Sequence, residues 1–237
     1  MILLILFVLA FAPGIFYLLY FYSKDRMEPE PLHLVIRMFV IGLLAAIPIA
    51  LIESAFIWAG SFLLIILVAP VIEEYGKYLS VKLSMARHPE FDEPFDGIIY
   101  AVAAALGFAS IENLGYLATA YQEGTQELIW TAAARAFLSV PGHALFSSMW
   151  GYALGMSILI TDADQKREFI LRGLLAGMLF HAAFNFLAFS AGAFGIFAAL
   201  ALILGVALAW RLVKQRIDMA LEVSPHQGSD PDEPPYS

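Results

Sequence analysis

The chain has no cysteine and few charged residues. Its 237 residues include not one cysteine, which excludes disulfides, thiolate nucleophiles and cysteine-based zinc sites. Charged side chains make up 14% of the sequence, whereas about a quarter is usual in a soluble domain. No stripe of basic residues is present to bind nucleic acid. This balance is typical of a protein that lies in lipid rather than in water.

Apolar residues fill almost the whole length instead. They account for 61% of the chain, and the mean hydropathy is +0.77. A helix needs about 20 mostly apolar residues to cross a bilayer. The sequence therefore predicts an all-α, polytopic helix bundle of about seven transmembrane helices in a cell membrane, forming one domain over residues 1–221. The predicted spans lie near residues 1–22, 32–53, 56–80, 96–120, 129–160, 169–189 and 192–213.

The two ends of the chain carry separate expectations. Residues 1–22 lack the positive n-region and the cleavage pattern of a signal peptide, so we expect a retained first span. Residues 222–237 are rich in proline, serine and acidic side chains, so we expect a disordered cytoplasmic tail.

Proline and glycine within the predicted spans bear on helix packing. Prolines lie inside several of the predicted spans, among them Pro48, Pro70 and Pro141. Membrane helices tolerate such prolines where neighbours satisfy the freed carbonyl groups. Two pairs of glycines are spaced four apart: Gly151 with Gly155, and Gly173 with Gly177. This spacing predicts faces on which helices approach closely.

The basic residues give the bundle an orientation. Lysine or arginine follows the first, third, fifth and seventh predicted spans: Lys24, Arg26, Lys82, Arg87, Lys166, Arg167, Arg211, Lys214 and Arg216. The alternate connections contain neither residue. Because positive residues favour the cytoplasmic side, we expect the N-terminus outside and the C-terminus in the cytoplasm.

Several ionisable or amide side chains lie within the predicted spans. They are Glu73, Glu74, Lys77, Glu112, Asn113, His143, His181 and Asn185. An isolated charge at the bilayer centre costs about 2.5–3.5 kcal/mol, so such groups face the bundle interior, meet partners and are functional candidates. With a rise of about 1.5 Å per residue, their depths permit convergence in the middle of the bundle. Arg135 and Glu53 are expected near the outer interface, where long side chains reach water.

Each candidate also has a purely structural interpretation. Glu73 or Glu74 would simply neutralise Lys77, since the three share neighbouring helix faces. A membrane histidine often bonds a neighbouring carbonyl, and Asn185 alone would join two helices. Three glutamates and two histidines on four spans are together better explained by function.

Three designs of intramembrane protease lack their residues here. A zinc enzyme with His-Glu-x-x-His on one helix turn is excluded because the motif is absent. An aspartyl enzyme needs two membrane aspartates that share a proton, and only Asp96 lies at the edge of a span. No serine occupies the glycine-flanked loop of a serine enzyme. Glutamate and histidine therefore remain as the candidate catalytic residues.

Four motifs stand in order on successive predicted spans: Glu73-Glu74-x-x-Lys77, Phe108-x-x-x-Glu112-Asn113, a lone His143, and His181-x-x-x-Asn185. This series resembles that of the PrsW family, membrane proteases that make the first cut in certain anti-sigma factors. The resemblance covers a motif-bearing core of about residues 70–186. CAAX prenyl endopeptidases and bacteriocin-immunity proteins are related, but they place a histidine at the position of Glu112 and an arginine in place of Lys77.

The resemblance implies that Glu73 or Glu74 activates a water for attack on a peptide carbonyl, and it does not say which. Lys77 would keep one glutamate ionised. The implied substrate is a single-span membrane protein that enters laterally between helices within the lipid. An anti-sigma factor follows from the family name alone, and the oligomeric state is not implied.

The other motif residues would complete the site. By resemblance, Glu112 and His143 hold or polarise the water, and His181 with Asn185 stabilises the oxyanion. Glu112, His143 and His181 are also an adequate ligand set for one divalent metal such as zinc. The CAAX relatives are argued to work through glutamate without metal, so the metal is left open.

Three other interpretations compete with a PrsW-type protease. A CAAX-type or bacteriocin-immunity protease would share the chemistry, but Phe108-x-x-x-Glu112 favours PrsW. A proton-coupled transporter or channel would use the same carboxylates and histidines as a proton relay, yet the sequence shows no inverted repeat. An inactive scaffold would not need an intact set of glutamates and histidines.

Overall fold

The computed structural model describes residues 2–226, and this part of the chain is helical without a β-strand. The longer helices are α1 (Ile2–Tyr22), α2 (Leu32–Ser54), α4 (Ala69–Ser84), α5 (Pro94–Glu123), α6 (Thr125–Ala134), α7 (Val140–Met156), α8 (Ala163–Phe194) and α9 (Ile196–Glu222). Short turns of helix complete the chain: η1 (Ile57–Ala59), α3 (Ser61–Leu63), η2 (Leu64–Val68), η3 (Arg135–Ser139) and η4 (Ser157–Leu159). The predicted all-α bundle is confirmed.

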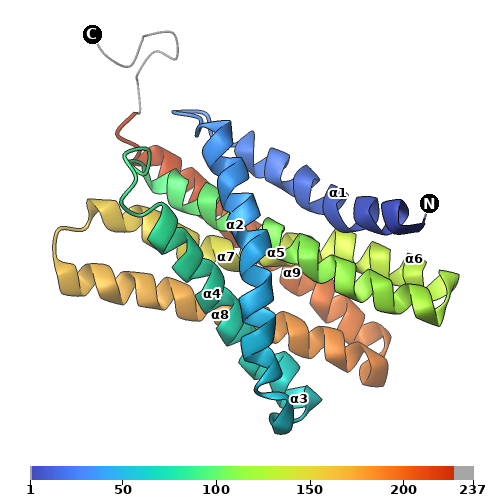
Figure 1. Cartoon of the computed structure of the whole chain (residues 1–237). Coiled ribbons are helices and arrows are strands. Elements are labelled where there is room, and N and C mark those ends of the chain that lie inside the picture. Colours follow the sequence, from blue (N-terminus) through green and yellow to red (C-terminus); the bar gives the residue numbers. More distant parts are fainter. Residues whose placement is uncertain (1, 227–237) are drawn as a thin grey trace.

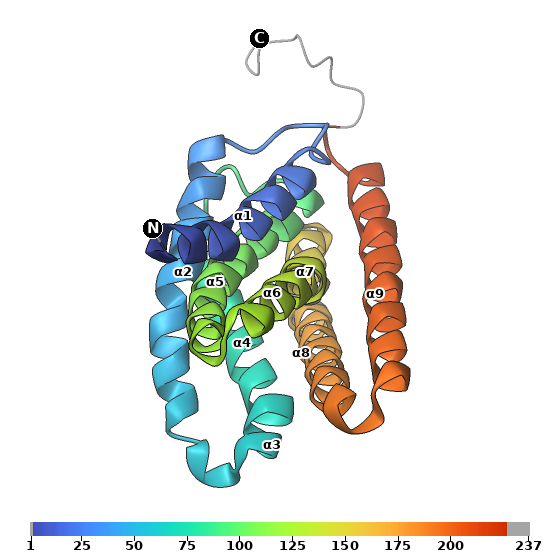
Figure 2. The ribbon, with the colours of Figure 1, turned by 90° about the vertical axis from the view of Figure 1, so that its right-hand side faces the viewer.

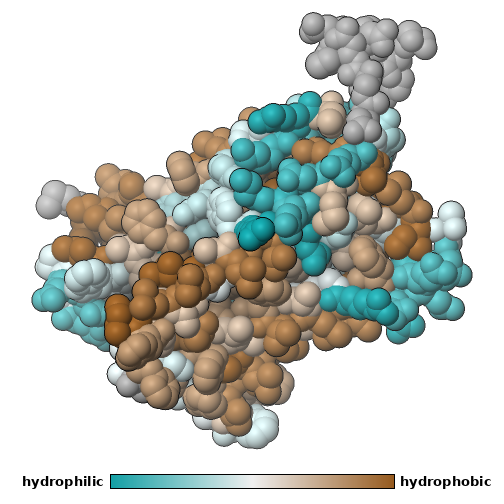
Figure 3. Space-filling view, turned by 180° about the vertical axis from the view of Figure 1, so that it is seen from behind, coloured by the Kyte–Doolittle hydropathy of each residue, from teal (hydrophilic) through white to brown (hydrophobic). Residues whose placement is uncertain are grey.

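Five of the described helices are long and apolar enough to cross a membrane: α1, α2, α5, the stretch Ala163–Gly192 of α8, and α9. The other two predicted spans, 56–80 and 129–160, are also helical, but each is divided by a π-helical turn, η2 or η3. The chain is a multi-pass membrane protein, while the count of seven spans and the sidedness stay predictions. Its outer surface suits lipid, since large apolar side chains such as Leu3, Phe16 and Leu204 are exposed. Hydrophobic residues cover most of the face in Figure 3, and hydrophilic ones gather toward its top and its two lateral ends.

Helices α5 and α7 form the centre of the bundle, with α2 and α9 on opposite flanks (Figures 1 and 2). Every residue in the first half of α5 and in α7 up to Gly155 is buried. A Cβ atom on Gly155 would lie 2.0 Å from the carbonyl oxygen of Pro94, so only glycine permits this approach of α7 to α5. Gly173 and Gly177 of α8 pack equally closely on α7. Both predicted glycine faces are confirmed.

The two π turns follow from proline chemistry. Proline has no N–H, and its ring crowds the carbonyl group four residues earlier. For Pro70 that residue is Ile66 in η2, and for Pro141 it is Phe137 in η3. The carbonyl oxygen of Ile65, in the first of these turns, accepts a hydrogen bond from Asn185 Nδ2 of α8 at 2.9 Å. A neighbouring helix therefore satisfies the irregular backbone, as the sequence predicts.

The last described residues pack against the start of α5. Glu222 still belongs to α9, and the buried Ser224 donates a hydrogen bond to the Glu93 carboxylate. The predicted tail, 222–237, thus begins with ordered residues, because Ser224 finds a buried acceptor. Residues 227–237 of that tail lie outside the described residues.

Candidate active site

Helix α4 places two glutamates and a lysine inside the bundle. Glu73 is 4% exposed, and Glu74 and Lys77 are 0% exposed. The Lys77 ammonium donates to Glu73 Oε2 at 3.1 Å and to Glu74 Oε1 at 2.9 Å. The spacings of four and three residues bring these side chains together on one side of the helix. Lys77 also lies over the Phe108 ring, 4.2 Å from its centroid, so an aromatic face covers the cation.

The two predicted histidines meet this group from α7 and α8. His143 Nδ1 lies 3.2 Å from the Lys77 ammonium, and His181 Nδ1 lies 3.1 Å from Glu74 Oε1. The two imidazole rings are 5.0 Å apart and nearly perpendicular. Glu73 Oε2 is 3.9 Å from His143 Nδ1 and 3.9 Å from His181 Nε2. These distances exceed a direct hydrogen bond and leave room for a bridging water.

Glu112 joins the site through His143 rather than through Glu73. Its Oε2 lies 2.9 Å from His143 Nε2 and accepts from Arg135 at 2.7 Å. Because the Lys77 ammonium has no lone pair, His143 Nδ1 must accept from it. The ring proton then lies on Nε2 and is donated to Glu112. Glu112 therefore orients the imidazole from the side opposite Lys77.

The two adjacent glutamates differ in their surroundings. Glu74 Oε2 accepts from Ser147 at 2.7 Å and from Trp150 at 2.9 Å, while its Oε1 faces Lys77 and His181. Four partners thus surround this fully buried carboxylate. Glu73 instead lines two adjoining cavities.

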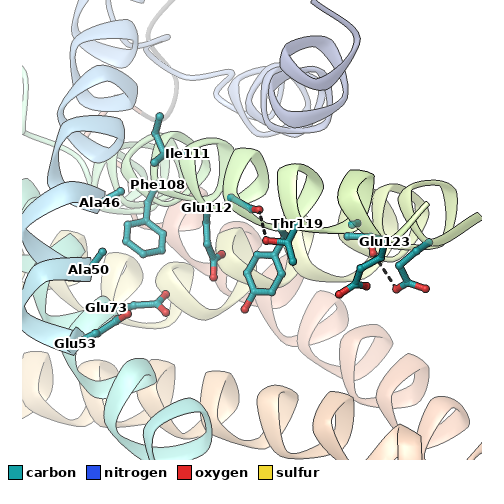
Figure 4. A pocket seen from close by; sticks show the side chains of 14 residues that line it. Ala46, Ala50, Glu53, Glu73, Phe108, Ile111, Glu112, Thr119 and Glu123 are labelled. Atoms are coloured by element: carbon teal, nitrogen blue, oxygen red, sulfur yellow. Dashed lines mark hydrogen bonds between the residues drawn. The ribbon is translucent and has the colours of Figure 1, made fainter. Parts of the chain in front are cut away.

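The cavities connect the site with the space between the helices. The larger has a volume of about 700 Å³ and lies between α2, α4, α5 and α6, and Figure 4 shows Glu53, Glu73 and Glu112 among its walls. The smaller, of about 390 Å³, shares these three glutamates and adds His143 and His181. Asn185 and Arg135 also line the smaller cavity. The predicted carboxylates and imidazoles therefore meet beside a common open space.

Comparison with known proteins agrees with this geometry. The family model described as PrsW family intramembrane metalloprotease matches residues 30–211. A protein named Protease PrsW from Geobacillus kaustophilus (strain HTA426) is 36% identical over 208 residues, covering 86% of this chain and 88% of the relative. This chain belongs to the PrsW family. A protein of the same name from Bacillus subtilis (strain 168) is 35% identical, covering 74% of this chain and 79% of the relative. Another from Clostridioides difficile (strain 630) is 32% identical, covering 77% of this chain and 78% of the relative. No solved structure matches.

The family's description names a metal, and the donor set of this PrsW-family chain fits one. Ligand atoms of Glu73, Glu74, His143 and His181 all lie within 4.8 Å of one another. Zinc takes histidine nitrogen and carboxylate oxygen, and two carboxylates balance a divalent charge. Lys77 contacts three of the four side chains, so a metal would compete with its ammonium. The group differs from the predicted ligand set of Glu112, His143 and His181, because it contains both α4 glutamates and leaves Glu112 behind the His143 ring.

Several residues of the site escape a reading of the sequence. Arg135 was expected at the outer interface, but it is 9% exposed and bonds both Glu112 and Asn113. Ser147 and Trp150 follow His143 by four and seven residues, so they share its helix face. That spacing is the signal that would have found them. Asn185 was predicted to stabilise an oxyanion, and its amide donates a hydrogen bond to the backbone carbonyl of Ile65.

Proposed function

We propose that this membrane peptidase hydrolyses a peptide bond of a single-span membrane protein, with Glu73 as the base that activates water. The observation that carries this proposal is the position of Glu73. It lines both cavities, and its Oε2 stands 3.9 Å from a nitrogen of His143 and from a nitrogen of His181. A water at this point would touch a carboxylate and two imidazoles at once.

The surroundings of the two α4 glutamates distinguish the base from its neighbour. A general base needs a free oxygen within reach of the proton that it takes. The Glu74 oxygens are occupied by Lys77, Ser147, Trp150 and His181. Glu74 therefore holds His181 and Lys77 in place, and Glu73 meets the water.

The reaction then runs in two steps on Glu73. The carboxylate accepts a proton from water as the water oxygen attacks the peptide carbonyl carbon. When the C–N bond breaks, Glu73 returns that proton to the leaving amine. The Lys77 ammonium donates a hydrogen bond to Glu73 Oε2 at 3.1 Å and holds this carboxylate in position.

The remaining residues position the water and the substrate. His143 and His181 hold the water, and Glu112 fixes the His143 ring through Nε2. Asn185 Nδ2 uses one hydrogen for Ile65, and its second hydrogen serves the oxyanion. A divalent ion held by the two histidines and the α4 glutamates would polarise the water and the carbonyl oxygen.

The substrate enters from the lipid between the helices. Cavities of about 700 and about 390 Å³ match sites that bind a short segment rather than a folded domain. An unwound stretch of a transmembrane segment is such a substrate. Because the motif series resembles that of a family that cuts certain anti-sigma factors, anti-sigma factors are the first single-span proteins to test.

The proposal is tested by cleavage in nanodiscs. Single-span substrates are incubated with the wild type and with Glu73→Gln, Glu74→Gln, Glu112→Gln, His143→Ala and His181→Ala, with and without a chelator. We expect Glu73→Gln to lower the rate about 10²–10⁴-fold. Glu168→Gln is the control. Glu168 lies on the exposed face of α8 and, among the described residues, pairs only with Arg172, at 2.5 Å. Normal cleavage by a folded Glu73→Gln variant would refute the assignment of the base.

A further inference from the structure

The larger cavity is lined by acidic residues from four helices. Its walls include Glu53 of α2, Glu73 of α4, and Glu112 and Glu123 of α5, and Glu127 of α6 stands near the α5–α6 turn. Figure 4 shows Glu53, Glu73 and Glu112 pointing into one space and Glu123 farther along it. No lysine or arginine lines this cavity among the described residues. The space is therefore suited to a positively charged occupant.

The charges around this space are only partly balanced within the chain. Glu73 has Lys77 at 3.1 Å, and Glu112 has Arg135 at 2.7 Å. Glu53 has no such cation among the described residues, and its Oε1 is a buried oxygen without a hydrogen-bond partner there. Its carboxyl group is close enough to interact electrostatically with Glu73, Glu112 and Lys77. A side chain expected at the outer interface thus lies at the entrance to the active site.

Ionising a carboxyl group in a partly dry wall costs free energy, and a ligand cation offsets that cost. We propose that Glu53 binds a lysine or arginine side chain of the substrate, next to the bond that Glu73 cleaves. The enzyme would then select single-span proteins that carry a basic residue beside the scissile bond. This inference rests on the proposed function and names its substrate class.

Two further acidic residues of this cavity also favour a basic substrate segment. Glu123 and Glu127 are exposed at the far end of the cavity. Clefts lined by charge of one sign raise the local concentration of ligands of the opposite sign. They would attract a basic segment, and Glu53 would then fix one side chain of it. Glu53 is accordingly a specificity residue that contacts substrate, whereas Glu123 and Glu127 affect the rate of binding.

The test uses one cleaved single-span substrate in matched forms. Each position flanking the scissile bond carries arginine, glutamine or glutamate in turn, and kcat and KM are measured in nanodiscs. We expect one position at which arginine to glutamine lowers kcat/KM about tenfold, mainly through KM. Glu53→Gln should remove this discrimination, and Glu53→Lys should prefer the substrate with glutamate. Glu168→Gln should discriminate as the wild type does.

The outcomes separate the two proposals. If the wild type cleaves the substrates and no flanking position distinguishes arginine from glutamine, Glu53 does not select a basic residue, and the proposed function still holds. If the wild type cleaves none of the single-span substrates, the proposed function fails, and this inference fails with it. If Glu53→Lys does not fold, the wild-type series and the nearly isosteric Glu53→Gln decide the matter.

Discussion

At the scale of single residues, the adjacent side chains of Glu73 and Glu74 have different surroundings. Successive residues of a helix point about 100° apart. Glu74 therefore faces α7 and α8, where Ser147, Trp150 and His181 contact it, and Glu73 faces the cavities. The buried Glu74 carboxylate holds its neighbours in place, and Glu73, the proposed base, faces the cavities.

This division predicts a difference in stability. An amide at position 74 has one oxygen where the carboxylate has two, so Glu74→Gln leaves buried donors such as Trp150 Nε1 without an acceptor. We expect the free energy of unfolding to fall by about 1–3 kcal/mol and the thermal midpoint in nanodiscs to fall with it. Glu73→Gln, which faces the cavity, should change the midpoint less. Equal midpoints for the two variants would contradict the separate roles.

The members of the site could be predicted from the sequence, but their contacts could not. Ionisable residues such as Glu73, Glu112 and His143 are easily identified in the sequence because the rest of each span is apolar. Such residues are stable inside a membrane protein only when they contact polar partners. Which glutamate faces the cavity depends on the rotation of α4 against its neighbours, and the sequence does not specify that rotation. Arg135 was misplaced for a similar reason, since its long side chain reaches either the interface or Glu112.

At the scale of helices, the two π turns position the site. Pro70 stands three residues before Glu73, and Pro141 stands two before His143. A π turn contains one more residue than an α turn, so it rotates the following helix relative to the preceding part. The sequence predicts that these prolines are tolerated, and it does not predict the π geometry, because that depends on partners such as Asn185.

Removal of one proline tests this role. Pro141→Ala restores an N–H group, which permits regular α-helical bonding through η3 and shifts His143 relative to Arg135. We expect a loss of about a hundredfold in kcat, the effect of a displacement near 1 Å, with insertion retained. Pro48→Ala in α2, a helix without a π turn, is the matched control. Cleavage should be measured in the same nanodiscs, and an equal effect of the two substitutions would argue against the π turn.

At the scale of the molecule, the basic connections lie together. The loops after α1, α4 and α7 and the end of α9 lie toward the left of Figure 1, whereas the α5–α6 and α8–α9 turns lie toward the right. The basic connections are therefore on one side of the bundle, and which side faces the cytoplasm stays a prediction. The number of spans was harder to predict, because hydropathy does not show that η2 and η3 divide two of them.

The absence of cysteine offers a direct test of orientation. Gln122 and Gln165 are both exposed, and they lie at the α5–α6 and α7–α8 connections. With Gln122→Cys or Gln165→Cys as the only thiol, a membrane-impermeant maleimide is added to intact cells. We expect labelling of the first variant alone, and labelling of the second once the cells are opened. The reverse pattern would place the N-terminus in the cytoplasm.

The α1–α2 loop predicts a dependence of stability on pH. Burial and the nearby charge of Glu93 together raise the pKa of Asp25 from 3.8 to about 7, and burial raises that of Glu30 from 4.5 to about 7. The folded state therefore binds these protons more tightly than the unfolded state. Their contribution to stability is complete below about pH 4 and is lost as the pH rises to about 7.

We therefore expect the wild type to have a lower thermal midpoint at pH 8 than at pH 5. The Asp25→Asn/Glu30→Gln double variant should lose part of this difference, because neither side chain titrates, whereas the nearby Glu93, whose pKa burial also raises, still does. In the wild type the Tyr100 hydroxyl donates a hydrogen bond to the Glu30 carboxylate. In the variant it can donate to the amide oxygen of the glutamine at position 30. The same difference between pH 5 and pH 8 in both proteins would show that these carboxyls do not cause it.

The most direct measurement is the reactivity of a single thiol at the two adjacent glutamate positions. Glu73→Cys and Glu74→Cys each give the chain one cysteine, and a small water-soluble thiol reagent is added to the folded protein in nanodiscs. We expect Glu73→Cys to react, because position 73 lines the cavities, and Glu74→Cys to stay unmodified until the protein is unfolded. Equal reactivity at the two positions, or protection of position 73, would contradict a water-reachable Glu73 at the centre of the site.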